Sequence, residues 1–243
     1  MRVPRIFVPE SVAGRDSVVL GGTGARHLTI VLRMKPDAAV ILFDGRGGEY
    51  GGTITKVEHN RVVVSVGEHR AVERESLLSV RLIQGISRGE RMDWVVQKST
   101  ELGIARVTPV FTVRSTVRLD ERRAERQVTH WTGVATSACE QCGRNRLPSI
   151  DMPMSLDDCL ESLDDSDSPR LVLSMTGRFD LNRDPPATAV TLLVGPEGGL
   201  ETSELDAAQR AGFAPFKIGP RVLRTETAAI VAITTVQSVW GDL

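Results

Sequence analysis

Two glycine-bearing loops near the end of the sequence carry the residue types best suited to bind a ligand. Residues 195–199 read GPEGG and follow an apolar run, and residues 218–228 read IGPRVLRTETA after another short apolar stretch. Glycines let bare backbone N–H and C=O groups approach a ligand closely. Neither loop contains GK[ST] or G-x-G-x-x-G, so neither is a Walker loop or a dinucleotide fingerprint. Together they predict a ligand site.

The sequence from residue 78 onward alternates between short apolar runs and segments with helical spacing. The predicted strands are 78–84, 106–111, 171–174, 190–194 and 216–218, and the predicted helices are 90–102, 120–142, 157–163, 203–211 and 226–240. Such alternation predicts a parallel sheet flanked by helices, with ligands bound at the carboxyl ends of its strands. Both glycine loops fall at strand ends, and residues 174–177 follow a third. We expect Thr202 to cap one helix, and Thr225 or Thr227 to cap the last.

The helix predicted over 226–240 is apolar nearly all round. A helix of this kind is buried, and one domain covers only part of it. The remainder predicts contact with a partner subunit, most simply in a two-fold homodimer.

Residues 1–70 differ from the rest, because turn signals at 21–24, 44–48 and 59–60 separate short apolar runs. The runs, which read as strands, are 6–8, 17–20, 39–43 and 61–66. This pattern predicts a small β-barrel, followed by a charged linker over 71–77. The first 35 residues carry six basic side chains against two acidic ones, although the whole chain has a net charge of −1. This excess of basic residues suggests a surface that binds a polyanion. The alternative is an ordinary surface of mixed charge.

Composition narrows the class of protein further. No apolar run reaches the ~20 residues that a membrane helix needs, and we expect no signal peptide, because the N-terminus lacks an apolar core. Three cysteines argue for a reducing cytoplasm. Cys139 and Cys142 form a CxxC without a second pair, and the four histidines are scattered, so no metal site is expected.

Motifs along nearly the whole chain resemble those of the SPOUT methyltransferases, and within them the bacterial small-subunit rRNA uridine-N3 methyltransferases. In order they are 5–7 (RIF), His27, 31–33 (VLR), 44–45 (DG), 93–94 (DW), 97–103 (QKSTELG), 114–115 (RS), 140–144 (EQCGR), 195–199 (GPEGG) and 223–228 (LRTETA). Departures are small: Cys142 stands where the family usually has Ser, Leu200 where it often has Phe, and Ile218 where it often has Leu.

The resemblance implies an α/β fold with two domains. Residues 78–243 would form a SPOUT domain with a parallel sheet and a trefoil knot, and residues 1–70 a PUA-like RNA-binding β-barrel. The knot follows from the resemblance alone, because chains by default do not knot. The resemblance also implies a cytoplasmic homodimer that binds S-adenosylmethionine and no metal. Its substrate would be 16S rRNA in an assembled or partly assembled 30S subunit.

The resemblance assigns roles to individual residues. The expected cofactor contacts are Met175, Thr176, Val194, Gly195, Pro196, Glu197, Gly198, Gly199, Ile218, Gly219, Val222, Leu223, Thr225, Thr227 and Ala228. The expected RNA contacts are Arg5, Arg26, Arg33, Arg91, Lys98, Arg114 and Arg144. On the helix over 90–102, Arg91, Trp94, Lys98 and Glu101 form one polar stripe, which is also typical of a solvated face. Glu197 either places the ligand or ties its loop down.

N3 of uridine is a weak acid, so catalysis must stabilise the anion that its deprotonation leaves on the ring. Arg224 is the first candidate for this role and Arg144, from a partner chain, is the second. Glu226 and Glu140 are candidate bases, and bulk water is the alternative. Two other interpretations stay open: a non-enzymatic RNA-binding or ribosome-assembly protein, which the intact glycine loops argue against, and a SPOUT enzyme that acts on tRNA.

Overall fold

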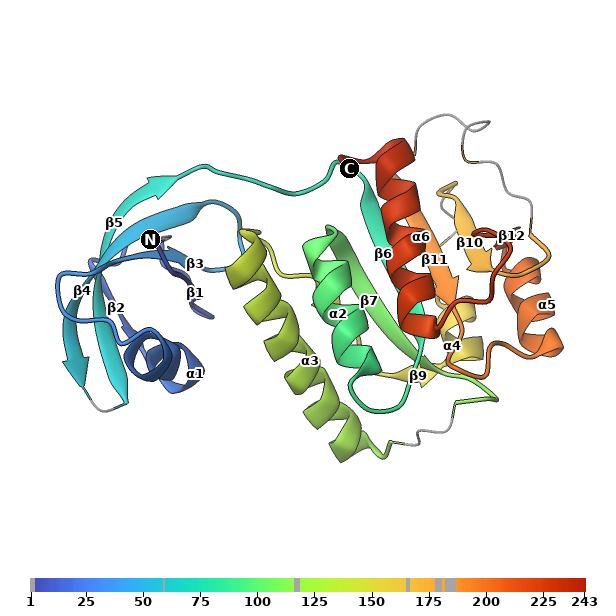
Figure 1. The fold of residues 1–243 in the computed structure, drawn as a ribbon, viewed down its shortest axis with the longest axis horizontal. Helices are drawn as coiled ribbons and strands as arrows, with labels where there is room; N and C mark the ends of the chain where they lie inside the picture. The colour runs from blue at the N-terminus through green and yellow to red at the C-terminus, as the bar shows by residue number, and fades with distance from the viewer. Residues whose placement is uncertain (1–2, 59, 116–118, 165–166, 178–180, 182–186) are drawn as a thin grey trace. The chain divides into compact units, whose positions relative to one another are not determined.

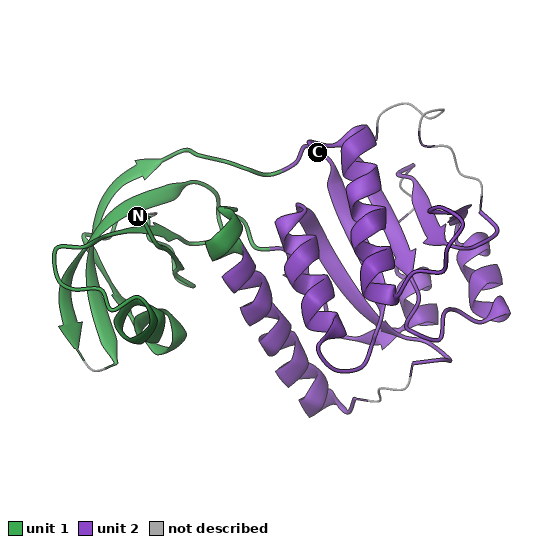
Figure 2. Cartoon of the chain, in the orientation of Figure 1, with its two compact units in different colours: residues 1–75, 139–147 green, residues 76–138, 148–243 purple. Residues whose placement is uncertain are grey.

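The chain, described here by a computed structural model, divides into two compact units (Figure 2). The first unit consists of residues 1–75 and 139–147, and the second of residues 76–138 and 148–243. The structure describes residues 3–58, 60–115, 119–164, 167–177, 181 and 187–243. The division after Glu75 falls inside the segment expected as a linker. Residues 139–147, which the sequence placed in the second domain, belong to the first unit.

The first unit contains a curved five-stranded sheet with the strand order β1-β3-β4-β5-β2 (Figure 1). Its strands are β1 (Arg5–Phe7), β2 (Ser17–Leu20), β3 (Ala39–Phe43), β4 (Glu49–Glu58) and β5 (Arg61–Arg70). β1 pairs with β3 in parallel, and the other neighbours are antiparallel. Apolar side chains from all five strands share one interior, which confirms the expected N-terminal β fold.

Two helical turns and one strand of this unit escaped the sequence analysis. The turns α1 (Gly22–Arg26) and η1 (His27–Val31), the second a π-helix, follow β2. Ala25 and Leu28 are buried there at helical spacing, but the glycines at 21–24 had indicated only a turn. Strand β4 was missed because two adjacent glycines interrupt its apolar alternation.

A buried arginine joins residues 139–147 to the β-sheet of the first unit. Arg5 is 6% exposed and hydrogen-bonds through its guanidinium to Glu49, and also to the side-chain oxygen of Asn145 at 2.5 Å. Burial alone would raise the pKa of Glu49, but the hydrogen bond and charge of Arg5 outweigh it and hold that pKa below its ordinary value. Arg5 thus crosslinks the unit from inside.

The second unit is built on a parallel sheet with the order β12-β10-β11-β6-β7-β8, with β9 also paired to β7 (Figure 1). Its strands are β6 (Ser79–Gly85), β7 (Ile104–Phe111), β8 (Ser149–Ile150), β9 (Met154–Ser155), β10 (Arg170–Leu173), β11 (Ala189–Val194) and β12 (Ala214–Phe216). Its helices are α2 (Arg91–Glu101), α3 (Glu121–Cys142, whose end belongs to the first unit), α4 (Leu156–Glu161), α5 (Thr202–Arg210) and α6 (Thr225–Trp240). The predicted alternation is confirmed.

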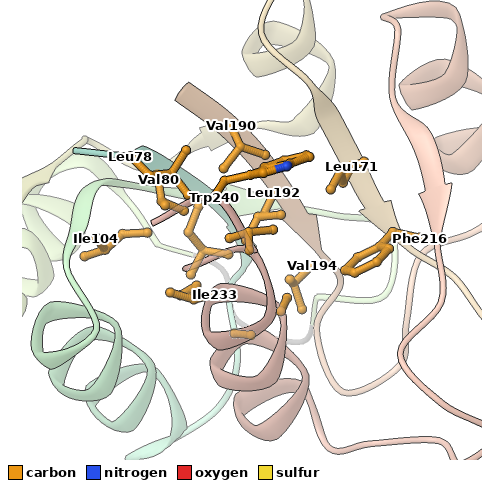
Figure 3. Packing of buried hydrophobic residues seen from close by; sticks show 14 of the residues in the cluster. Leu78, Val80, Ile104, Leu171, Val190, Leu192, Val194, Phe216, Ile233 and Trp240 are labelled. Carbon is orange, nitrogen blue, oxygen red and sulfur yellow. The ribbon is translucent and has the colours of Figure 1, made fainter. Parts of the chain in front are cut away.

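Helices cover both faces of this sheet because successive strand residues point to opposite sides. Leu82 and Leu192 pack with α6, whose Ile233 and Trp240 lie over the strands (Figure 3). The next residue on β11, Leu193, belongs to the core on the other face, together with side chains of α4 and α5. No helix among the described residues is long and apolar enough to cross a membrane.

Both helix caps proposed from the sequence were wrong. The N-cap of α5 is Glu201, which forms a reciprocal capping box with Glu204. The N-cap of α6 is Arg224, without a side-chain cap, and the Thr225 hydroxyl bonds outside its own helix. The threonines were chosen because hydroxyl side chains commonly cap helices. In α5 a carboxylate takes that role, and at the start of α6 the Thr225 hydroxyl makes a tertiary contact instead.

Replacing Arg5 with alanine should destabilise the first unit, because it leaves Glu49 buried without its main partner. We expect Arg5→Ala to lower the free energy of unfolding by about 3 kcal/mol. Nη1 of Arg74 and Nη1 of Arg70 lie 3.6 and 3.9 Å from carboxylate oxygens of Glu49, and their charges limit the loss of stability. Denaturant unfolding at neutral pH measures it. The control Arg15→Ala breaks an exposed pair and should cost below about 1 kcal/mol.

The same ion pair predicts a pH dependence. Because the folded pKa of Glu49 is lowered, its contribution is fully present above its unfolded value near 4.5 and is lost as the pH falls through the folded pKa. The difference in free energy of unfolding between the wild type and Arg5→Ala should therefore become smaller in acid. A difference unchanged from pH 7 down to pH 3 would contradict this account of Arg5.

Candidate functional site

A pocket of about 780 Å³ lies in the second unit, where β10, β11 and β12 end. Its volume is within the range of sites for small ligands and cofactors. Three loops line it, namely the ones that follow β10, β11 and β12, and Arg91 of α2 contributes from a fourth segment. The sequence had predicted a pocket from these three strand ends.

Most of the residues expected to contact a cofactor line this pocket. Gly219 and Thr227 do not, while Arg224 and Glu226 do. The sequence analysis did not assign Leu173, Leu200, Leu205, Phe216 and Arg221, which also line it. The apolar ones lie on or beside regular elements, where their types indicate only a core, so no signal in the sequence distinguished them.

The three glycines of the 195–199 loop serve different purposes. A Cβ on Gly195 would lie 3.0 Å from backbone atoms of Gly199 and Leu200, which is tighter than an ordinary contact, so the turn of the loop would have to shift. A Cβ on Gly198 would lie 2.9 Å from Cβ of Arg114. Gly199 has open space around it but a φ of +71°, which favours glycine. Contacts within the protein therefore give Gly195 and Gly198 a structural reason of their own, apart from the approach of a ligand.

A buried polar link holds the loop against the start of α6. The Thr225 hydroxyl donates to the carbonyl oxygen of Gly195 at 2.7 Å. The side-chain amide of Gln84 donates to Thr225 Oγ1 at 2.9 Å and lies 3.4 Å from the same carbonyl. Gln84 is fully buried, and Thr225 is nearly so. The ends of two strands, β6 and β11, are thus joined to the start of α6 beneath the pocket.

Glu197 ties the loop to the beginning of α2. Its Oε1 accepts a hydrogen bond from the backbone N–H of Arg88 at 2.9 Å and another from Nη1 of Arg91 at 2.6 Å. Partial burial would raise its pKa, but these hydrogen bonds and the charge of Arg91 lower it below the ordinary value. Of the two roles considered for Glu197, the geometry favours the anchoring one.

Arg114 braces the other side of the loop. Its Nε donates to Glu201 and its Nη1 to the carbonyl of Gly198, both at 2.8 Å. Glu204 accepts from the backbone N–H of Val113, also at 2.8 Å. The guanidinium expected to bind RNA therefore supports the pocket wall.

Three residues assigned to RNA binding or catalysis instead lie inside the first unit. Arg5 is the buried crosslink described above. Arg144 is 5% exposed and donates through Nε to both oxygens of Glu75 at 3.1 Å. Glu140 accepts from the backbone N–H of Phe7 at 3.0 Å, and burial raises the pKa of its carboxyl group. Burial corrects the assignment of Arg5 and Arg144 as phosphate contacts, and of Arg144 as a catalytic cation.

The remaining expected RNA contacts differ in their availability. Arg26 and Arg33 are exposed on and beside the helical turns of the first unit, and Arg33 has a φ of 51°. Lys98 pairs with Glu101 at 2.9 Å and lies over the ring of the exposed Trp94. Arg26 and Arg33 therefore keep the surface position that phosphate binding needs.

Comparison with known proteins supplies the family. A model of the RNA methyltransferase domain matches residues 73–237, and a model of the RNA methyltransferase PUA domain matches residues 20–67. The ribosomal RNA small subunit methyltransferase E of Buchnera aphidicola is 31% identical over all of this chain and 98% of its own length. The Bacillus subtilis protein of the same name is 29% identical over 88% of this chain and 87% of its own.

A solved structure agrees with these relatives. The ribosomal RNA small subunit methyltransferase E from Neisseria gonorrhoeae, bound to S-adenosyl methionine, superposes with a TM-score of 0.91 at 35% identity over the whole of both chains. The resemblance drawn from the motifs is thereby confirmed. The chain belongs to the RNA methyltransferase family, among the ribosomal RNA small subunit methyltransferases E.

Proposed function

We propose that the chain transfers a methyl group from S-adenosylmethionine to N3 of a uridine in 16S rRNA. The observation that carries this proposal is the pocket at the ends of β10, β11 and β12, built by the loops that the family's motifs mark. A relative solved with S-adenosyl methionine supports the cofactor, and the match to a PUA domain supports an RNA substrate.

The residues present fit this cofactor. The pocket is large enough for a nucleoside with an amino-acid tail, and its wall offers backbone groups, apolar side chains and charges of both signs. Residues 194–200 and 218–223 would hold the adenosine part. When bound, S-adenosylmethionine supplies an electrophilic methyl group, and no metal enters the proposal. Among the described residues, no three His, Cys, Asp or Glu side chains gather as a metal site would require.

The chain's own part in catalysis is to position the uracil and to stabilise negative charge on it. Arg224 is exposed in the pocket wall and forms no ion pair with any residue in the described ranges. It is therefore available to O2 or O4 of a uracil ring that loses its N3 proton. Of the two candidate bases, Glu226 lines the pocket and Glu140 does not.

The biological setting is part of the proposal. We propose a cytoplasmic homodimer that acts on the 30S subunit and carries a trefoil knot around the two glycine loops. The partly exposed side of α6, with Ile230 and Val231, supports a subunit contact, and Trp94 of the neighbouring α2 is 54% exposed. Aromatic residues of this kind are enriched at interfaces.

Methyl transfer to isolated 30S subunits tests the function directly. Subunits from cells lacking the protein should gain a methyl group at one uridine, seen as a block to reverse transcription. Transfer to tRNA instead would favour the tRNA interpretation, and no transfer to any RNA would favour a non-enzymatic role.

The double variant Arg26→Glu with Arg33→Glu should weaken RNA binding and leave cofactor affinity intact. Because phosphate contacts depend on salt, RNA binding by the wild type should fall steeply as the salt concentration rises.

Removing Arg224 should affect the chemical step. We expect Arg224→Ala to lower kcat by about 10²- to 10³-fold, the loss typical of one donor to a developing anion. Its affinity for S-adenosylhomocysteine should change little, and its rate should rise with pH, because ionisation of N3 is no longer assisted. Single-turnover assays across pH and calorimetry measure both. A variant with normal kcat, or with lost cofactor affinity as its one defect, would contradict this role.

A further inference from the structure

One carboxylate oxygen in the pocket wall has no hydrogen-bonding partner among the residues that the structure describes. Glu226 lies in the first turn of α6, and its side chain is 17% exposed. Its Oε2 is buried and accepts no hydrogen bond from any residue that the structure describes. A buried anionic oxygen without a donor is costly, so a partner that lies outside the described side chains is expected here.

The nearest cation does not satisfy this oxygen. Nε of Arg91 is 3.9 Å from Glu226 Oε2, which is beyond hydrogen-bonding distance. Nη1 of the same guanidinium is occupied by Glu197 at 2.6 Å. The two carboxylates of the pocket therefore differ: Glu197 accepts two hydrogen bonds from the protein, whereas Oε2 of Glu226 accepts none from the described residues.

We propose that Glu226 binds the α-ammonium group at the amino-acid end of S-adenosylmethionine. This inference rests on the proposed function and deepens it by assigning a residue to that end of the ligand. An ammonium group carries three N–H donors and a full positive charge, so it supplies both what Oε2 lacks and the opposite charge that a buried carboxylate requires.

Other donors of the same ligand fit less well. The hydroxyls of its ribose and the amino group of its adenine are neutral, so they can donate a hydrogen bond to Oε2 but bring no opposite charge to the buried carboxylate. The amino-acid end is also a zwitterion, so its carboxylate needs positive charge nearby. Arg221 is exposed on the loop that leads into α6 and lines the same pocket. One short stretch of chain thus offers both signs of charge.

Two ligands that share adenosine but differ at the other end test the assignment. S-Adenosylhomocysteine carries the ammonium group, and 5′-methylthioadenosine lacks the whole amino-acid end. We expect Glu226→Gln to weaken the first by about 10- to 100-fold in calorimetry, the scale of one hydrogen bond between charged groups, and to leave the second unchanged. The matched control Glu197→Gln, which loosens the loop, should weaken both ligands alike.

An analogue of S-adenosylhomocysteine with hydrogen in place of the amino group completes a double-mutant cycle. It should bind the wild type as weakly as the parent compound binds Glu226→Gln, and the variant should lower its affinity no further. The comparison of the two ligands on the wild-type protein needs no variant. It therefore tests the proposal even if Glu226→Gln does not fold.

Three results would overturn the assignment. If Glu226→Gln loses affinity for both adenosine ligands equally, the role of Glu226 is structural. If its affinity for both is unchanged, Glu226 does not bind the ligand. Normal affinities with a reduced kcat and a lost ionisation in the pH profile would make it the base. Failure of the proposed function looks different, because the wild-type protein would then bind neither adenosine ligand.

Discussion

The pocket depends on one hydrogen-bonded carbonyl group, which joins its two glycine loops. The oxygen of Gly195 accepts the Thr225 hydroxyl, and Thr225 in turn accepts the amide of Gln84. These residues come from the ends of β6 and β11 and from the start of α6, which are neighbours in the second unit but far apart in sequence. Because Gln84 and Thr225 are buried, their polar groups need partners, and the Gly195 carbonyl supplies one.

Two arginines extend this constraint to the surface. Arg91 holds Glu197 from one side of the loop, and Arg114 holds Gly198 and Glu201 from the other. A loop that is rich in glycine loses much conformational entropy on folding, so fixing it in advance leaves less to be lost when a ligand binds. The rigidity of the site therefore comes from charged side chains that themselves need not touch the ligand.

The sequence predicted the second unit well because its information is local. Buried parallel strands read as apolar runs, and the amphipathic pattern of α2 and the two glycine loops mark the edges between elements. In the first unit, glycines obscured α1 and the strand β4. There the pattern of buried residues, such as Ala25 and Leu28, was weaker than the turn signal.

The roles of the charged residues could not be predicted in the same way. Arg5, Arg114 and Arg144 were expected to contact RNA, yet each pairs with a carboxylate far along the chain, at Glu49, Glu201 and Glu75. An ion pair between distant residues leaves no periodic trace in the sequence. The same holds for Glu226, whose significance comes from an oxygen that the fold leaves without a donor.

The central claim is that the link at Gly195 sets the shape of the cofactor site, and Thr225→Val tests it most directly. This substitution keeps the shape of the side chain and removes its hydroxyl. Thr235→Val is the matched control, because that hydroxyl donates within α6, to the carbonyl of Val231 at 2.7 Å, and makes no other hydrogen bond to the described residues. Calorimetry with S-adenosylhomocysteine should show about a tenfold or greater loss of affinity for Thr225→Val and none for Thr235→Val. A folded Thr225→Val protein that binds the ligand as tightly as the wild type would contradict the account.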